Sequence, residues 1–298
     1  MEKPRSLRSR LKEGISAPMG EIYRKSRSVL LSLGLRRGVK FVQPKEEQDA
    51  SGDFSVVMPI FDSPPLARCL ASVERYAPKA EVILVDDGSI LSETKRIIKE
   101  YATRNRWITV QNKSSLGHSG ATEAGALYAT RRYLCLLNAD TIVTPWSWRA
   151  AQEAFEADAK IAVTGPTTSH ATTVQMVRRA ELCRHYWSDS QIFGFAQKYV
   201  QSQPSRCWVD LPDIAGFALF IRRDVWERCG GFDPNLRHYG NEVELCKRIL
   251  KQGFRIVWTR NSYIHHLGSQ SYSNSAYGAD FIVSSSQNAQ NYIDRKHS

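Results

Sequence analysis

The sequence predicts an α/β fold with a mixed, mostly parallel β-sheet flanked by helices, preceded by a basic helical appendage. Two observations support the sheet. From residue 54 onward, short apolar runs alternate with segments of helical periodicity, which favours parallel strands joined by right-handed crossovers. Two of these runs stop abruptly at acidic residues. With 298 residues and 42% hydrophobic content, the chain can bury the core of one large domain, expected at 51–275.

The appendage and linker are expected at residues 1–50. The formal net charge of the chain is +11, and residues 1–41 hold eleven Lys and Arg against three Glu, so this segment carries +8 of it. Apolar residues recur at near-helical spacing from Met19 to Leu33. Such a basic amphipathic helix can bind an anionic membrane surface, although a solvated or domain-packing helix has the same pattern. Nucleic acid is not an expected partner, because the charge lies outside the motifs described below.

Cysteine usage and hydropathy suggest a location. The six cysteines are scattered without a Cys-x-x-Cys pair, which favours a reducing compartment over a disulfide framework or a zinc site. Neither a secretory signal nor an apolar run long enough to span a bilayer is visible. We therefore expect a cytoplasmic protein, with peripheral attachment to the inner face of the membrane through the appendage as an option. Residues 276–298 read as a polar tail.

The first two strands are expected at Ser55–Met58 and Val82–Val85, with a helix at Leu66–Tyr76 between them. Pro59 ends the first strand, and Asp86-Asp87-Gly88-Ser89 ends the second. Since parallel strands end at one edge of a sheet, both ends are predicted to face the same crevice, where open α/β sheets bind ligands.

The next units are a helix at Leu91–Ala102, a strand at Ile108–Gln111 and a Gly-rich helix at Gly117–Thr130. They lead to the apolar strand Tyr133–Leu137, which stops at Asn138-Ala139-Asp140. Alternation along an extended chain places Asn138 and Asp140 on one side.

Two acidic strand ends together with two Gly-rich segments, at Gly88 and Gly117, suggest a nucleotide-diphosphate site. Mg2+ and Mn2+ take carboxylate and phosphate oxygens as ligands, so either is an expected cofactor. Neither Gly segment matches the dinucleotide or the phosphate-loop fingerprint, which argues against a dehydrogenase or a kinase. The simpler explanation of Asp140 is that it ends the strand or caps the following helix.

Seven segments in this order resemble the family 2 glycosyltransferases of GT-A fold, in particular rhamnosyltransferase-like members that assemble polysaccharides. They are Ser55–Pro59, Glu81–Ser89, Asn112–Ala121, Leu136–Thr141, Gly216–Asp233, Tyr239–Arg248 and His265–Ser269. The resemblance covers about residues 54 to 275.

This resemblance implies an inverting, metal-dependent enzyme that moves a single sugar from a nucleotide-diphosphate sugar to a hydroxyl acceptor. The acceptor would be a saccharide, a lipid-linked molecule or a protein, in cell-surface polysaccharide or glycoconjugate assembly. The stretch Gln203–Trp208 has the wrong spacing and position for the Gln-x-x-Arg-Trp signature of processive synthases, which favours transfer of one sugar per event.

The resemblance also assigns the donor site. In this family the first acidic strand end holds the nucleoside, and an Asp-x-Asp motif binds the metal. The residues expected to bind the donor are Pro59, Asp62, Asp86, Asp87, Gly117, Asn138 and Ala139. Asp140 stands at the metal-binding Asp, while Asn138 replaces the other; the diphosphate and water can supply the missing oxygens.

The base motif of the family usually reads Glu-Asp, and this chain has Asn241-Glu242. Glu242 is therefore expected to deprotonate the acceptor. The simpler explanation is that Glu242 is a carboxylate at the N-terminus of a helix, where the helix dipole favours it. Glu244 is predicted to face elsewhere. A late His completes the metal or diphosphate site in related enzymes. We assign His265 to the metal, with His266 or a purely structural pair as alternatives.

Two other function classes stay open at this point. A nucleotidyltransferase also places carboxylates around a metal, but it normally shows a Gly-rich loop with Arg or Lys after the first strand, where this chain has Ile60–Pro65. A non-enzymatic adapter would bind membrane or nucleic acid through the basic appendage. Release of nucleoside diphosphate rather than pyrophosphate distinguishes sugar transfer from nucleotidyl transfer.

Overall fold

The computed structural model of the chain describes residues 49–178, 180, 185, 187–268 and 279–297. Residues 1–48, nearly all of the expected appendage, lie outside the described residues, so the basic helix and its membrane role stay predictions.

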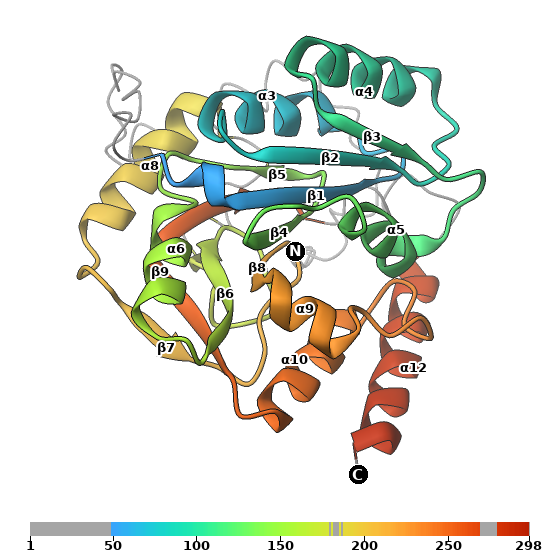
Figure 1. The fold of residues 1–298 in the computed structure, drawn as a ribbon. Coiled ribbons are helices and arrows are strands. Elements are labelled where there is room, and N and C mark those ends of the chain that lie inside the picture. Colours follow the sequence, from blue (N-terminus) through green and yellow to red (C-terminus); the bar gives the residue numbers. More distant parts are fainter. Residues whose placement is uncertain (1–48, 179, 181–184, 186, 269–278, 298) are drawn as a thin grey trace, which may run out of the picture. The chain divides into compact units, whose positions relative to one another are not determined.

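The described strands form one mixed sheet, drawn across the centre of Figure 1. They are β1 (Phe54–Ile60), β2 (Glu81–Asp86), β3 (Ile108–Gln111), β4 (Tyr133–Leu137), β5 (Thr141–Ile142), β6 (Ile161–Thr168), β7 (Trp208–Asp210), β8 (Ala218–Arg222) and β9 (Arg255–His266). Their spatial order is β3-β2-β1-β4-β8-β6-β9-β5, and β7 pairs with β9. The first four are parallel, as the alternation predicts, and β8 runs antiparallel to both β4 and β6.

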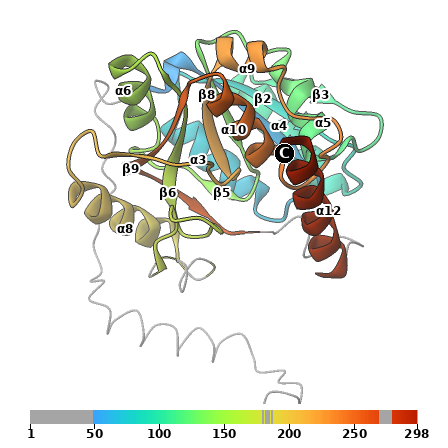
Figure 2. The ribbon, with the colours of Figure 1, turned by 90° about the horizontal axis from the view of Figure 1, so that it is seen from below.

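Helices cover both faces of this sheet (Figures 1 and 2). One face carries α3 (Leu66–Tyr76), α4 (Ser92–Asn105), α6 (Arg149–Ala157) and α8 (Asp189–Gln201). The other carries α5 (Gly117–Ala126), α9 (Arg223–Cys229) and α10 (Asn241–Lys251). A one-turn 3-10 helix, η2 (Ser51–Asp53), precedes β1.

Strand β4 shows why the sheet is buried on both sides. All five of its residues are buried. Tyr133 and Leu137 pack into the core on the α3 side, whereas Leu134 and Leu136 pack into the core on the α5 side. A strand with apolar side chains in both directions needs a helix layer on each face. The strand order places β4 in the middle of the sheet, between β1 and β8.

The chain beyond β4 turns back into the sheet. Strand β5 pairs antiparallel with the end of β9, and Thr141 lies opposite His266. The backbone N–H of Leu267 donates to the carbonyl oxygen of Asp140 at 2.9 Å. This short ladder brings the end of β9 beside the end of β4.

The expected polar tail is in fact helical over much of its length. Helix α12 (Ala279–His297) packs Ala289 and Ile293 against Leu236, close to the start of α10 (Figure 2). Ala289 and Ile293 lie four residues apart, and so on one side of a largely polar stretch of helix, which is why composition alone concealed this packed face.

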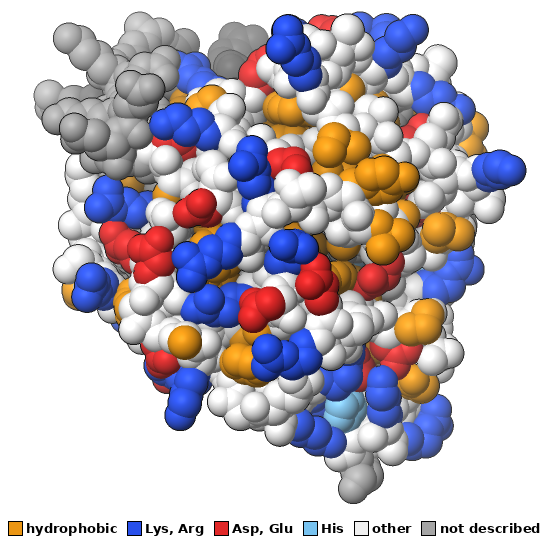
Figure 3. All heavy atoms as spheres, viewed as in Figure 1, with side chains coloured by type: hydrophobic (Ala, Val, Ile, Leu, Met, Phe, Trp, Pro, Cys, Tyr) orange, Lys and Arg blue, Asp and Glu red, His pale blue; other side chains and the backbone are white. Residues whose placement is uncertain are grey.

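Charged side chains of both signs are interspersed on the face shown in Figure 3. Among the described residues of the whole domain, exposed ion pairs include Arg104 with Glu74 at 2.7 Å. Exposed pairs of this kind contribute only about 0–1 kcal/mol each to stability. None of the helices in the described part of the chain has the length and apolar character needed to cross a bilayer.

Candidate active site

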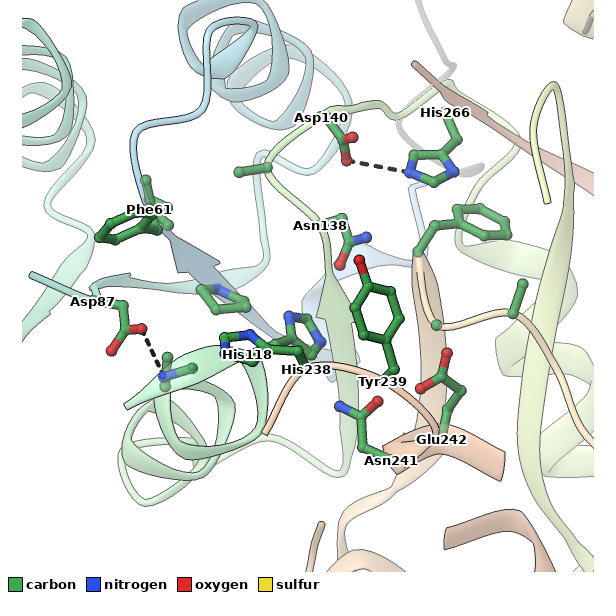
Figure 4. Close-up of a pocket in the computed structure, with 18 of the residues that line it drawn as sticks. Phe61, Asp87, His118, Asn138, Asp140, His238, Tyr239, Asn241, Glu242 and His266 are labelled. Atoms are coloured by element: carbon green, nitrogen blue, oxygen red, sulfur yellow. Dashed lines mark hydrogen bonds and ion pairs between the residues drawn. The ribbon is translucent and has the colours of Figure 1, made fainter. Parts of the chain in front are cut away.

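A cavity of about 320 Å3 opens at the carboxyl edge of the parallel strands (Figure 4). Its walls come from the loops after β1, β2 and β4, the start of α5, the segment before α10 and the end of β9. The structure brings together seven of the residues expected from the sequence: Pro59, Asp87, Gly117, Asn138, Ala139, Asp140 and Glu242. Three others, Asp62, Asp86 and His265, are not among the lining residues.

Asp87 organises the loop that leads into α5. Its Oδ1 accepts hydrogen bonds from the Asn112 side chain and the Leu116 backbone N–H, both at 2.8 Å. Its Oδ2 accepts from the Ser115 hydroxyl at 2.7 Å and the Gly117 N–H at 3.0 Å. Four donors match the usual capacity of a carboxylate, so Asp87 shapes its end of the cavity chiefly by holding this loop.

Asp86 and Asp62 hold the loops beside Asp87 and are not among the lining residues, so their expected contact with the donor stays a prediction. Asp86 accepts from the backbone N–H of Ser89 at 2.8 Å. Asp62 accepts from the N–H groups of Ile90 and Leu91, each at 3.0 Å. It does so from a left-handed backbone (φ 42°), which Asp tolerates better than most residues. Both carboxylates shape the turn that presents Asp87.

At the opposite end of the cavity, Asp140 faces His266 (Figure 4). The Oδ1 of Asp140 lies 3.2 Å from the Nε2 of His266. The Nδ1 of His266 lies 2.8 Å from the backbone carbonyl oxygen of His170. A carbonyl only accepts, so Nδ1 carries a proton and donates to it, which turns Nε2 toward the Asp140 carboxylate. The ring also stacks on Phe217, with centroids 5.2 Å apart.

His265 does not take the position expected for it. Neighbouring residues of a strand point to opposite faces, and His265 is fully buried, with Nδ1 2.9 Å from the Tyr263 hydroxyl and its ring stacked on Trp187. The residue beside Asp140 is instead His266. The pairing of β5 with β9 explains this placement, because the register decides which histidine faces the cavity, and a metal contact by either histidine stays a prediction.

Glu242 enters the cavity from the first turn of α10. Its carboxylate accepts hydrogen bonds from its own backbone N–H and from that of Gly216. Burial raises the pKa of Glu242 above its usual range; these two donors offset part of the rise, and the nearby Asp213 adds to it. A carboxylate that is easier to protonate in its pocket is also a stronger base once ionised.

Gly216 makes room for that carboxylate. A Cβ added there would lie 2.7 Å from Oε1 of Glu242 and 2.9 Å from its Cδ. We expect Gly216→Ala to displace the carboxylate while the fold survives, because the crowded atoms are the end of a flexible side chain. A misplacement near 1 Å can cost about 100-fold in rate, so turnover should fall roughly 10- to 100-fold. Steady-state kinetics and a melting curve measure both effects.

The control for this variant is Gly52→Ala, whose added Cβ would meet Lys79 at an ordinary 3.5 Å. Parent-like turnover in Gly216→Ala would show that the carboxylate position does not limit the reaction.

Glu244 points away from the cavity, as the helical spacing predicts. It is fully buried and paired with Arg248 at 2.6 Å and Lys296 at 2.7 Å. These partners lower the pKa of Glu244 although burial opposes them. It is a structural carboxylate.

Several lining residues were not assigned from the sequence, among them His118, His238 and Tyr239. Burial lowers the pKa of His118 to about 4, with the neighbouring His238 as a second cause, so His118 is neutral at pH 7. Burial and Arg237 likewise lower the pKa of His238. The sequence feature that could have identified His118 as a lining residue is its position in the Gly-rich start of α5, close to the end of a strand.

Ser119 and Asn241 join the α5 wall to the α10 wall. The Ser119 N–H donates to the carbonyl oxygen of Arg237 at 3.1 Å, and its hydroxyl donates to that of Leu236. Asn241, where the family usually has Glu, is buried and donates to the Ser119 hydroxyl at 3.1 Å. The residue before Glu242 is thus anchored to the helix that begins at the Asp87 loop.

The sheet and the carboxylates around its edge match the expected glycosyltransferase of GT-A type. The sequence model of the family described as "Glycosyl transferase family 2" matches residues 55–229, more than half of the chain. This chain belongs to glycosyl transferase family 2, which confirms the expected enzyme class over the nucleotidyltransferase and adapter alternatives. Glu242 lies beyond the matched segment.

The chain is similar to known proteins over only part of their length. The chain is similar to the O-antigen biosynthesis protein RfbC of Myxococcus xanthus, with 26% identity over 242 residues, which are 77% of this chain and 18% of that protein. It is also 33% identical over 76 residues to an uncharacterized protein of Mycobacterium tuberculosis, covering 24% of this chain and 28% of the other. The similarity therefore spans less than a third of either relative.

Solved structures agree on the fold. GalNAc-T7 with UDP, GalNAc and Mn2+ has a TM-score of 0.56 at 20% identity, covering 72% of this chain and 42% of the other. The mannosyltransferase PcManGT of Pyrobaculum calidifontis, in complex with GDP-Man and Mn2+, has a TM-score of 0.54 at 14% identity, covering 92% and 76%. At these identities the likeness establishes the GT-A fold alone.

Proposed function

We propose that the protein is an inverting, metal-dependent glycosyltransferase that moves one sugar from a nucleotide-diphosphate donor to an acceptor hydroxyl. The observation that carries the proposal is a single cavity with Asp140 and His266 at one end and the Glu242 carboxylate, held by Gly216, on another wall.

The ligand atoms of Asp140 and His266 fit a divalent cation. A carboxylate oxygen and an imidazole nitrogen face each other at 3.2 Å, and the other nitrogen of the ring donates to the carbonyl of His170. Such an outer hydrogen bond is the usual way in which a metal-binding His is oriented. No cluster of three or more ligand side chains occurs among the described residues, so the remaining ligands would come from the diphosphate and water.

The charge of the cavity gives a second reason to expect a bound divalent cation. Its described lining includes the carboxylates of Asp87, Asp140 and Glu242 but no Lys or Arg. A nucleoside diphosphate adds further negative charge to these walls. A cation held by Asp140 and His266 would neutralise the charge that develops on the departing diphosphate.

Glu242 would act as the general base. Its carboxylate takes the proton of the acceptor hydroxyl while the oxygen attacks the anomeric carbon, and the bond to the diphosphate breaks on the other side. One displacement of this kind inverts the anomeric configuration. Tyr239, from the same segment, lines the space beside Glu242 (Figure 4) and offers an aromatic face to the acceptor.

The comparisons support a nucleotide-sugar donor and a role in polysaccharide assembly, but they identify neither the sugar nor the polysaccharide. The two structural neighbours were solved with Mn2+ and with UDP or GDP-Man, which supports a nucleotide-sugar donor and leaves Mg2+ or Mn2+ as the cofactor. The O-antigen relative supports a role in polysaccharide assembly, with a saccharide, lipid-linked or protein acceptor. The scattered cysteines support cytoplasmic residence, and the basic residues 1–41 support peripheral binding to an anionic membrane surface.

A panel of nucleotide sugars tests this function. We expect one member to raise the melting temperature in the presence of Mn2+ or Mg2+ and not in EDTA, because a ligand that binds only the folded state stabilises it by mass action. Incubation of that donor with acceptor sugars should release nucleoside diphosphate. Release of pyrophosphate, or binding that ignores the metal, would contradict the proposal.

The pH dependence tests the base. Because Glu242 must be ionised to accept a proton, turnover falls as the pH drops through its pKa; burial raises this pKa, so the fall should begin above the usual range of a Glu. We expect the midpoint of the acid limb to lie above 4.5, the ordinary value. Turnover at saturating substrates from about pH 4 to pH 8 measures it. A midpoint at or below the ordinary value would argue against Glu242.

A further inference from the structure

Helix α12 packs on the segment that carries the proposed base. Ile293 and Ala289 are buried against Leu236, and Tyr239 and Val243 pack on the same cluster. Tyr239 also lines the cavity. One layer of side chains therefore separates the C-terminal helix from the cavity.

The approach is closest at Gly240, two residues before Glu242. Gly240 has a left-handed backbone (φ 76°), and a Cβ there would lie 2.9 Å from Cδ1 of Ile293 and 3.1 Å from Cβ of Ala289. The turn that starts α10 is thus formed directly against α12, and a glycine is needed for both its backbone angle and its lack of a side chain.

Charges join the same two parts of the chain. The Nζ of Lys296 lies 2.5 Å from Oδ2 of Asp233 and 2.7 Å from Oε1 of Glu244. The Tyr292 hydroxyl donates to the same Asp233 oxygen at 2.8 Å. Asp233 precedes the segment and Glu244 follows Glu242 on α10, so Lys296 connects both ends of residues 233–244 from outside the cavity.

We propose that α12 is a positioning element for the transfer reaction, in which Ile293 and Lys296 hold residues 236–244 so that Tyr239 and Glu242 face the acceptor. This inference rests on the proposed role of Glu242. Both residues act through the segment they brace, since neither is among the residues that line the cavity. The inner side of the segment is anchored by Ser119, and α12 supplies the outer support.

The test compares Lys296→Met with Arg295→Met. Both remove one cation from an exposed position in the last turn of α12, but of the two only Lys296 is paired with Asp233 and Glu244. In Lys296→Met we expect amide hydrogen exchange in residues 236–244 to accelerate about 10-fold and turnover to fall about 10-fold or more. Affinity for GDP and UDP with Mn2+ should stay within about twofold of the parent, and Lys296→Arg should restore turnover.

A milder variant, Ile293→Val, removes one methylene from the packed face of α12. It serves as the test if Lys296→Met does not fold. We expect faster amide exchange in residues 236–244 and lower turnover, both smaller than in Lys296→Met. Unchanged exchange in residues 236–244 in the folded variants would overturn the inference, as would equal effects of Arg295→Met. Faster exchange with parent-like turnover would also overturn it. If the parent transfers no sugar from any donor, the proposed function fails, and the exchange data alone decide whether α12 orders this segment.

Discussion

Asp140→Asn is expected to lower metal-stimulated turnover by about 1,000-fold while the protein stays folded. The substitution keeps the shape of the side chain but removes the charge that faces His266 at 3.2 Å. A bound cation supplies several kcal/mol of stabilisation to a departing phosphate, and about 4 kcal/mol corresponds to that loss. Turnover with and without EDTA, and the Mn2+-dependent shift in melting temperature caused by GDP or UDP, should decline together.

Asp224→Asn is the matched control, because its exposed carboxylate lies 4.0 Å from Arg228 on α9 and outside the cavity lining. It should behave as the parent does. An Asp140→Asn enzyme that Mn2+ still stimulates to near the parent rate would remove Asp140 from the metal site.

Glu242→Gln is expected to lower turnover by about 100- to 10,000-fold, the usual contribution of a general base. Gln preserves the length of the side chain and can still accept the hydrogen bond from Gly216, so donor affinity should hold. Glu242→Asp keeps the carboxylate but withdraws it by one methylene from the Gly216 N–H, and partial activity is expected. Turnover at saturating substrates, with nucleoside diphosphate affinity measured separately, distinguishes the two effects.

Glu244→Gln is unsuitable as the control, since Glu244 is fully buried between Arg248 and Lys296, and its loss would disturb the helix that carries Glu242. Glu227→Gln serves better, because the Glu227 side chain is exposed and its ion pair, within the described part of the chain, is with the exposed Arg223. If Glu242→Gln were as active as Glu227→Gln, the base would have to be another group.

The local hydrophobic pattern was enough to predict the strands and helices of the parallel half of the sheet. The apolar run Tyr133–Leu137 is β4, and the two residues predicted to share a side after it, Asn138 and Asp140, both line the cavity. The expected helix at Leu66–Tyr76 is α3. These succeed because periodicity and strand ends are properties of neighbouring residues.

Pattern was not enough where a residue's partner lies far along the chain. Asp86 and Asp87 are adjacent, yet only Asp87 lines the cavity, and its oxygens are engaged by a loop some 25 to 30 residues later. The polar composition of residues 276–298 concealed a helix whose buried side chains are matched by Leu236.

The sequence by itself determined the class of enzyme, the strands of the parallel half and the carboxylates at their ends, because each depends on short-range order and on recognisable motifs. Only the tertiary structure decided that His266 rather than His265 meets Asp140, that Gly216 leaves space for Glu242, and that α12 supports the base segment. The physical reason is that these contacts depend on strand register and on close packing between distant segments, and neither is encoded in the spacing of neighbouring residues.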